Sequence, residues 1–330
     1  VMFALILPHF CRASGQAGGD FLEIKASPRA SGMGEAFVAG GDDVSAMQWN
    51  PAGLAWIRSL QVEAAHLAYL LDDQFEVFTA ALPLRPGSVL GLRFSYATVG
   101  GLVVTDDMGL ETPAPNHDLM AEAALARSFG DRLALGFTGR FYQSRLVDFD
   151  ARGFSADLGL RYRVRKGFHL GASVQNLGPK ITYQEAGDPL PAWARLGAAL
   201  RVAETSRWDL ALNVEGDLPL FKGVDPYGAF GLEGSFSRIV FLRGGYNLAA
   251  KERGPTLGGG LSLSGFNLNY AFVPFGLLGN VHSFSLGYGF GRSESPQKPA
   301  LDLPLKNIPE SQSRVEAAVV ENVESPADIA

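Results

Sequence analysis

The chain has 330 residues, of which 47% are hydrophobic and only 19% are charged, with 40 glycines, 22 phenylalanines and one cysteine. The apolar content excludes a chain that is disordered throughout, and the lone Cys11 excludes a disulfide framework or a thiolate metal cluster. The formal net charge of −6 argues against nucleic acid as a partner. A helical membrane protein needs apolar runs of about 18 residues, and the sequence contains none.

The two ends differ in composition from the rest of the chain. Residues 1–17 pass from an apolar stretch into small and polar residues, which is typical of a secretory signal peptide. A buried N-terminal helix and a lipidated Cys11 are weaker alternatives. Residues 293–330 contain no glycine and no aromatic residue, but they carry five prolines and more acidic than basic residues. Such a segment cannot bury enough apolar surface to offset the entropy of ordering, so we expect a disordered acidic tail.

Between residues 59 and 291, apolar side chains alternate with small or polar ones. In residues 132–141, for example, Leu135 and Phe137 share one face, whereas Thr138 and Arg140 share the other. Because successive side chains of a strand point to opposite faces, this period of two predicts strands. Fourteen segments follow the pattern: 59–71, 74–83, 88–99, 119–129, 132–145, 153–164, 167–176, 192–203, 207–217, 226–237, 239–248, 256–264, 265–273 and 281–291.

The length and chemistry of these segments favour a membrane barrel over a soluble β-sandwich or propeller. Most are about 9–12 residues long, which is what a tilted strand needs to cross a bilayer. The polar positions hold mainly Gly, Ser, Ala and Asn rather than the Lys and Glu of a solvent-exposed face. Aromatic residues near strand ends suggest interfacial girdles: Tyr162, Trp193, Trp208, Tyr227, Tyr246 and Tyr288. A sheet that faces lipid must close, so we predict an all-β, antiparallel transmembrane barrel over residues 58–292.

Residues 18–57 differ from the predicted barrel. They are rich in Gly and Ala and lack sustained alternation. Asn50-Pro51 favours the start of a turn, and Gly53 follows within the same turn. A compact element of small residues that precedes a barrel is well suited to a place inside it.

Several blocks of the sequence resemble a known family. They are residues 27–39 (SPRASGMGEAFVA), 42–46 (DDVSA) and 49–55 (WNPAGLA), with supporting blocks at 171–180, 190–197, 270–276 and 278–287. Together they resemble the PorV/PorQ family of bacterial outer-membrane proteins, whose fold is similar to that of the fatty-acid transporter FadL. The chain departs from the family pattern at Gly40-Gly41. It also departs at its end, because the last barrel aromatic, Phe290, lies forty residues before Ala330.

The resemblance implies a barrel of about fourteen strands in the outer membrane, with residues 18–57 as an N-terminal hatch that plugs the lumen. The candidate hatch or gate residues are Asp42, Asp43, Trp49, Asn50, Pro51 and Gly53.

The sequence predicts neither catalysis nor a bound metal or cofactor. The five histidines lack metal-ligand spacing, and no nucleophile elbow occurs. The acidic pairs Asp42-Asp43 and Asp106-Asp107 fit helix caps or solvated loops better than a cation site. Charges on the polar faces of strands are candidates for the lumen: Arg132, Arg140, Asp157, Arg161, Arg163, Asp209 and Glu215. Buried charges must be paired, so these residues either brace the wall and hatch or line a polar ligand path.

Two functional hypotheses follow. In the first, the barrel transports or binds a hydrophobic or amphipathic small molecule, and the hatch controls passage. In the second, the protein docks or shuttles secreted cargo, as PorV-like members do in type IX secretion, through the loops 100–118 and 177–191 and the acidic tail. The expected partners are outer-membrane lipid, a hydrophobic small molecule, and a protein at the extracellular loops.

Overall fold

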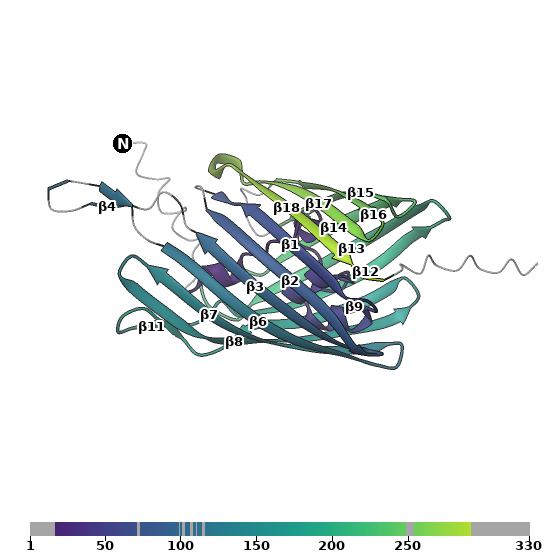
Figure 1. The fold of residues 1–330 in the computed structure, drawn as a ribbon, viewed down its shortest axis with the longest axis horizontal. Helices are drawn as coiled ribbons and strands as arrows, with labels where there is room; N and C mark the ends of the chain where they lie inside the picture. Colours follow the sequence, from purple (N-terminus) through teal and green to yellow (C-terminus); the bar gives the residue numbers. More distant parts are fainter. Residues whose placement is uncertain are drawn as a thin grey trace, which may run out of the picture. The chain divides into compact units, whose positions relative to one another are not determined.

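The structure is a computed structural model, and it describes residues 17–70, 73–98, 100, 103–105, 108–109, 111–113, 116–248 and 254–291. Fourteen antiparallel strands close into a barrel in the order β1-β18-β17-β16-β15-β14-β13-β12-β9-β8-β7-β6-β3-β2 (Figure 1). The predicted signal peptide up to residue 16, Cys11, the Asp106-Asp107 pair and the predicted tail lie outside the described residues.

Each of the fourteen predicted segments overlaps one barrel strand, so the predicted architecture is confirmed. The strands are β1 (Gln61–Ala68), β2 (Gln74–Arg85), β3 (Ser88–Thr98), β6 (Asn116–Phe129), β7 (Leu133–Leu146), β8 (Phe149–Arg165), β9 (Phe168–Leu177), β12 (Trp193–Glu204), β13 (Trp208–Pro219), β14 (Tyr227–Phe236), β15 (Val240–Asn247), β16 (Thr256–Leu263), β17 (Phe266–Pro274) and β18 (Asn280–Gly289). Two small hairpins were not predicted, β4 (Val103–Thr105) with β5 (Glu111–Pro113) and β10 (Ile181–Thr182) with β11 (Gly187–Asp188). Strands of two or three residues are too short to show a period.

The alternation places apolar side chains outside the barrel and small or polar ones inside. On β7, Leu135 and Phe137 are 41% and 51% exposed, whereas Ala134 and Thr138 are fully buried. This is the surface that a barrel presents to lipid. Among the described residues, no helix is long and apolar enough to cross a membrane.

The two rims of the barrel differ. At one rim, which we call the short-turn end, links of two or three residues join neighbouring strands, as between β8 and β9 or between β16 and β17. Ser264 and Gly265 form the latter turn with φ values of 52° and 88°. At the opposite rim, the long-loop end, longer links include both small hairpins. In outer-membrane barrels, short turns are periplasmic and long loops are extracellular.

Two of the six predicted girdle aromatics point inward instead. Trp193 is only 3% exposed, and Tyr227 packs edge-on against it with ring centroids 5.4 Å apart. The cause is a polar partner inside the barrel, because Trp193 Nε1 donates a hydrogen bond to Glu23 Oε1 at 2.6 Å. A buried indole N–H needs such an acceptor.

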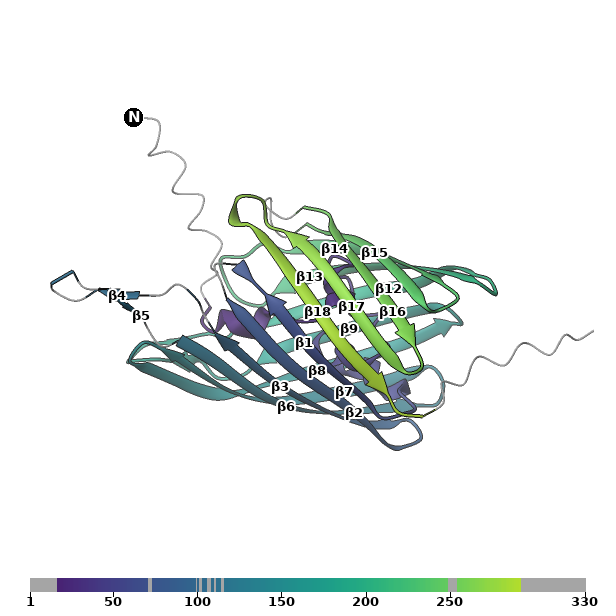
Figure 2. The same ribbon diagram turned by 45° about the horizontal axis from the view of Figure 1, so that its top comes forward.

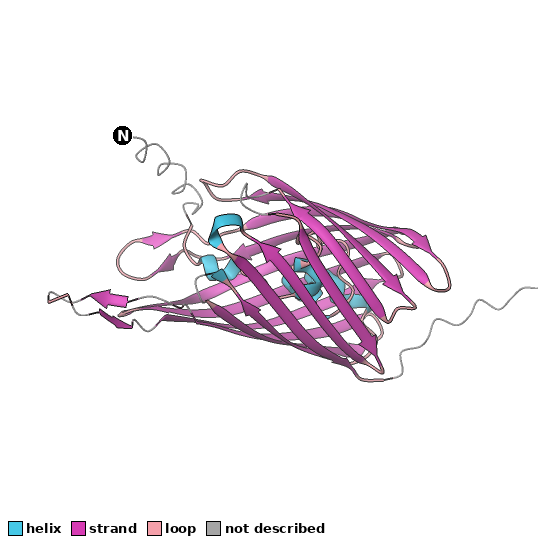
Figure 3. Cartoon of the chain, turned by 90° about the horizontal axis from the view of Figure 1, so that it is seen from above, coloured by secondary structure: helices cyan, strands magenta, loops and turns pink. Residues whose placement is uncertain are grey.

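Residues 18–57, which we call the N-terminal segment, lie inside the barrel (Figures 2 and 3). They form four short helical turns, η1 (Asp20–Glu23), α2 (Pro28–Ser31), η2 (Val44–Gln48) and η3 (Pro51–Trp56). At the long-loop end, Gly18 N donates to Pro189 O at 2.9 Å. At the short-turn end the chain leaves η3 and enters β1. The segment therefore runs the length of the barrel.

Candidate functional site

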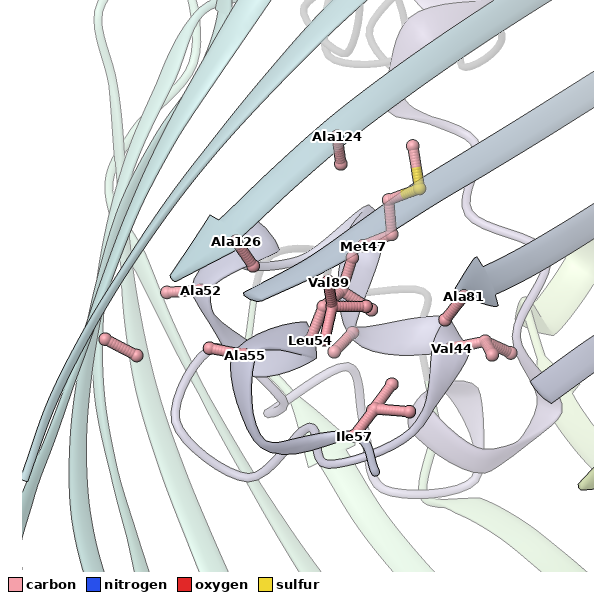
Figure 4. Close-up of a cluster of buried hydrophobic side chains, with 12 residues drawn as sticks. Val44, Met47, Ala52, Leu54, Ala55, Ile57, Ala81, Val89, Ala124 and Ala126 are labelled. Atoms are coloured by element: carbon pink, nitrogen blue, oxygen red, sulfur yellow. The ribbon is translucent and has the colours of Figure 1, made fainter. Parts of the chain in front are cut away.

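The last part of the N-terminal segment packs against an apolar patch on the inner wall. Figure 4 shows Val44, Met47, Leu54 and Ile57 of the segment together with wall side chains. The wall contributes small residues: Ala81, Val89, Ala124, Ala126 and Ala134. Because these side chains are short, η2 and η3 approach the strands closely. Burial of this apolar surface fixes the segment at the short-turn end.

Asn50 joins this packed part to the rest of the segment and to the wall. Its Oδ1 caps η3 by accepting a hydrogen bond from Ala52 N at 3.1 Å. Its Nδ2 donates to Val38 O at 2.8 Å and to Leu160 O of β8 at 3.0 Å. The side chain is 2% exposed. The predicted turn residue is thus a buried three-way junction, because one amide supplies both a donor and an acceptor.

Glycines on the wall make room for this corner. A methyl group on Gly159 would lie 2.9 Å from Pro51 Cδ and 3.0 Å from Ala52 N. One on Gly136 would lie 2.9 Å from Ala52 Cα. These inward-facing positions accept no side chain without movement of the segment, which is a common reason for glycine within a strand. Gly53 is equally confined, because a methyl group there would lie 2.7 Å from Gly41 O.

Glu215 of β13 holds the middle of the segment. Its Oε2 accepts hydrogen bonds from Phe37 N and Val38 N, both at 2.7 Å. Arg195 of β12 lies 3.6 Å from the other carboxylate oxygen and also pairs with Asp217. Two backbone N–H groups and one guanidinium therefore satisfy a buried carboxylate, as its desolvation requires.

Arg29 of α2 is the second charged link, and sequence reasoning missed it. It forms ion pairs with Asp42 at 2.6 Å and Asp43 at 2.7 Å within the segment. It also binds Glu233 of β14 through Nη2 and Nε, at 2.8 and 3.0 Å. Asp43 in addition caps η2 by accepting from Ser45 N at 3.0 Å. The available signal was that the segment holds only two basic residues but two adjacent aspartates.

Arg161 and Arg163 of β8 flank the indole of Trp56. Their guanidinium carbons lie 5.3 and 5.1 Å from the ring, a cation–π distance. Arg161 also donates a hydrogen bond to Gly41 O. The predicted arginines thus contact the N-terminal segment rather than open space.

Arg140 and Asp157 belong to a ladder on the wall itself. Arg140 of β7 pairs with Glu122 of β6 at 2.8 Å and with Asp157 of β8 at 2.9 Å. Arg93 of β3 pairs with the same Glu122. The ladder braces four neighbouring strands.

The remaining predicted residues lie in different surroundings. Arg132 is exposed in the turn before β7, because the strand begins one residue later than predicted. Asp209 pairs with Arg201 at 3.2 Å near the short-turn end. Trp49 is fully buried and packs edge-on against Phe37 at 5.5 Å.

Lys25 and Glu23 lie in the half of the segment nearer the long loops. Lys25 Nζ donates to Gln175 Oε1 at 3.0 Å and lies 4.8 Å from the Trp49 ring centroid. Burial and the nearby Arg195 guanidinium lower the pKa of Lys25 to about 7, against the opposing effect of Glu215. Burial raises the pKa of Glu23, and the Trp193 hydrogen bond opposes that shift.

No cluster of three or more His, Cys, Asp or Glu side chains suited to a metal ion occurs in the described part of the chain. The contacts described above have a mechanical consequence. They hold the N-terminal segment inside the closed wall by apolar packing at the short-turn end and by hydrogen bonds and ion pairs in the middle.

Comparison with known proteins agrees with this architecture. Residues 13–218 match the family of the type IX secretion system protein PorV. No curated protein matches the chain.

Solved structures with a similar fold include two that are described as toluene transporters. The toluene transporter TbuX of Ralstonia pickettii has a TM-score of 0.55 at 14% identity, covering 80% of this chain and 98% of its own. The toluene transporter TodX of Pseudomonas putida has a TM-score of 0.56 at 13% identity, covering 80% of this chain and 96% of its own. A FadL homologue of Pseudomonas aeruginosa has a TM-score of 0.54 at 13% identity, covering 84% of this chain and 100% of its own.

Proposed function

The chain belongs to the PorV family and is an outer-membrane β-barrel, and from that premise we propose that it moves hydrophobic or amphipathic small molecules across the membrane. In this proposal the N-terminal segment is the hatch. The solved relatives in fold include two described as toluene transporters, which supports a hydrophobic substrate.

One observation carries the proposal: the material inside the barrel is a separate segment and not part of the wall. The wall is complete without it, because all fourteen strands pair with both neighbours. A path therefore opens when the segment shifts, and no strand pairing has to break. The apolar contacts of η2 and η3 would stay in place while the links through Arg29 and Glu215 exchange partners.

Uptake into proteoliposomes tests the proposal. Vesicles that contain the full chain are given toluene or a long-chain fatty acid, and uptake is compared with that of protein-free vesicles. Faster uptake of at least one hydrophobic solute, with no change for a charged solute of similar size, is the expected result. Equal rates with and without protein for all hydrophobic solutes would refute transport.

A second candidate function is docking of secreted protein cargo. The family match favours it, because PorV is described as a type IX secretion system protein. The unpredicted hairpins β4–β5 and β10–β11 lie in links of the long-loop end, where such a partner would bind. Affinity capture with the purified chain from outer-membrane extract separates the two functions. A docking protein retains a stoichiometric protein partner, whereas a solitary transporter retains none.

A further inference from the structure

Charge is distributed unevenly around the short-turn end of the barrel. Four hairpins that follow one another around the wall, β2–β3, β6–β7, β8–β9 and β12–β13, carry exposed arginines at this end: Arg85, Arg127, Arg132, Arg165 and Arg207. By contrast, residues 261–268 around the β16–β17 turn and residues 284–291 at the end of β18 include no charged residue. The five arginines therefore lie on one side of the rim, and we call them the basic arc.

The basic arc lacks carboxylates that would neutralise it. Glu204 already pairs with three further basic residues of this rim, Lys166, Arg201 and Arg238. Asp131 stands beside Arg132 in the β6–β7 turn without an ion pair between them. Within the described part of the chain, none of the five arginines pairs with an acidic side chain. Like charges that gather without counter-charges indicate an anionic partner.

Three of these arginines belong to two hairpins that touch. Arg163 N of β8 donates a hydrogen bond to Arg132 O in the β6–β7 turn at 2.7 Å, and Arg165 ends the same strand β8. Arg127 lies on the outward face of β6, where its guanidinium carbon is 5.4 Å from the Phe129 ring centroid. The charge of the arc is thus concentrated beside β6, β7 and β8, and it extends onto the outer face of the barrel.

Aromatic rings place the basic arc at the edge of the membrane. Phe129 ends β6, and Tyr162 lies opposite Leu133 at the start of β7. Trp208 begins β13 and packs against Phe236 with ring centroids 4.7 Å apart. All four rings are exposed on the outer face. Because such rings gather where hydrocarbon meets headgroups, the arginines beside and beyond them lie at the level of the lipid phosphates.

We propose that the basic arc binds phospholipids whose headgroup carries a net negative charge. The short-turn end is the periplasmic side of an outer-membrane barrel, where phospholipids form the leaflet. A guanidinium matches a phosphate with two parallel hydrogen bonds, so Arg127, Arg132 and Arg165 would donate to the phosphate oxygens. The contact of Arg127 with an outward ring favours a lipid over an acidic protein. The site does not depend on whether the barrel transports a solute.

Lipid retention measured by native mass spectrometry tests the proposal. The full chain is purified in mild detergent and incubated with equal amounts of phosphatidylglycerol and phosphatidylethanolamine, and the lipids bound per protein are counted. We expect wild type to retain about tenfold more phosphatidylglycerol. Arg132→Gln and Arg165→Gln should each lower that ratio about fivefold, because one basic side chain near an anionic membrane surface contributes on that scale.

Arg145→Gln and Lys180→Gln are the matched controls, because they remove exposed positive charges at the long-loop end. Both should keep the preference for phosphatidylglycerol. The unfolding temperature should stay unchanged in Arg132→Gln and Arg165→Gln, since neither side chain forms an ion pair in the described part of the chain. Equal retention of the two lipids by wild type would overturn the proposal. So would an equal loss of preference in the controls, which would reduce the effect to net charge alone.

Discussion

Arg29 and Glu233 join the N-terminal segment to strand β14 through two hydrogen bonds, from Nη2 to Oε1 at 2.8 Å and from Nε to Oε2 at 3.0 Å. Arg243 of β15 approaches the same carboxylate at 2.7 Å. One acidic side chain of the wall thus pairs with two arginines, one from the wall and one from the segment. Glu233 is therefore the charged link between α2 and the wall, beside the hydrogen bonds of Thr256 to Gly32 O and Gly34 N.

Glu233→Gln should loosen the segment. The substitution removes the charge that two largely buried guanidiniums share, and breaking such a pair costs about 3–5 kcal/mol. Denaturant unfolding in detergent measures the loss, and hydrogen exchange should show weaker protection over residues 29–43. Glu204→Gln is the matched control, because Glu204 pairs with Lys166 and Arg201 near the surface, where about 0–1 kcal/mol is expected. Equal losses of stability in the two variants would contradict the role of Glu233 as a link between the segment and the wall.

Gly159→Ala should displace η3. The new methyl group would lie 2.9 Å from Pro51 Cδ, and overpacking of this kind costs about 1–3 kcal/mol. Gly234→Ala adds the same methyl group to a strand where its nearest neighbour is 3.9 Å away, so its effect should stay within about 0.5 kcal/mol. Thermal unfolding of the two variants gives the comparison. An unchanged unfolding temperature for Gly159→Ala would show that η3 is not tightly packed against β8.

Substitutions of Asn50 should separate its two roles. Asn50→Ala removes the cap and both donated hydrogen bonds, and we expect a loss of about 2–3 kcal/mol. Asn50→Asp keeps the acceptor for Ala52 N but turns a carboxylate toward Val38 O and Leu160 O. It should therefore be at least as destabilising as the alanine in unfolding experiments at neutral pH. A well-tolerated aspartate would mean that the cap alone matters.

Charged substitutions at two depths on the outer face of the barrel test where the membrane lies. Phe137→Arg places a charge on the outward face of β7 near its middle, where about 2–4 kcal/mol of destabilisation is expected in a bilayer. Leu133→Arg makes a comparable change on the same face at the short-turn end of the same strand, with an expected cost of about 0–1 kcal/mol. Unfolding from lipid vesicles should rank them in this order, and the reverse order would misplace the membrane.

The lowered pKa of Lys25 predicts that the stability of the protein depends on pH. Its pKa falls from the usual 10.5 to about 7 in the folded protein, so folding favours the neutral amine. Stability relative to Lys25→Met should decrease as the pH falls from about 10 to about 7 and level off below that range. Unfolding of both proteins at a series of pH values measures this difference. A difference that does not change with pH would show that Lys25 remains charged in the barrel.

The barrel was predictable because the pattern that marks each strand lies in consecutive residues. Residues 133–138 alternate between large apolar and small or polar side chains, and a lipid-facing surface on one side fixes which face each set takes. Boundaries were less certain, which is why Arg132 was assigned to the lumen and lies in a turn. Trp193 was misplaced for a different reason, since its acceptor, Glu23, is 170 residues away in the chain.

The contacts of the N-terminal segment could not be derived from residues 18–57 alone. The sequence marked Asp42, Asp43 and Asn50 as unusual, but their roles depend on wall residues that only the closed barrel brings near. Arg29 and Glu233 are separated by 204 positions, and Glu215 lies 177 positions from Val38. Spacing along one chain contains no signal for such pairs.

Removal of residues 20–57 tests the claim that this segment is the hatch more directly than any point substitution. Barrels with and without the segment are reconstituted into vesicles, and swelling in a small sugar reports an open lumen. The Glu233→Gln variant keeps the whole chain, so it tests the same claim even if the deleted protein does not fold. We predict rapid swelling for the deletion, an intermediate rate for Glu233→Gln and almost none for wild type. A folded deletion that swells no faster than wild type would contradict the account.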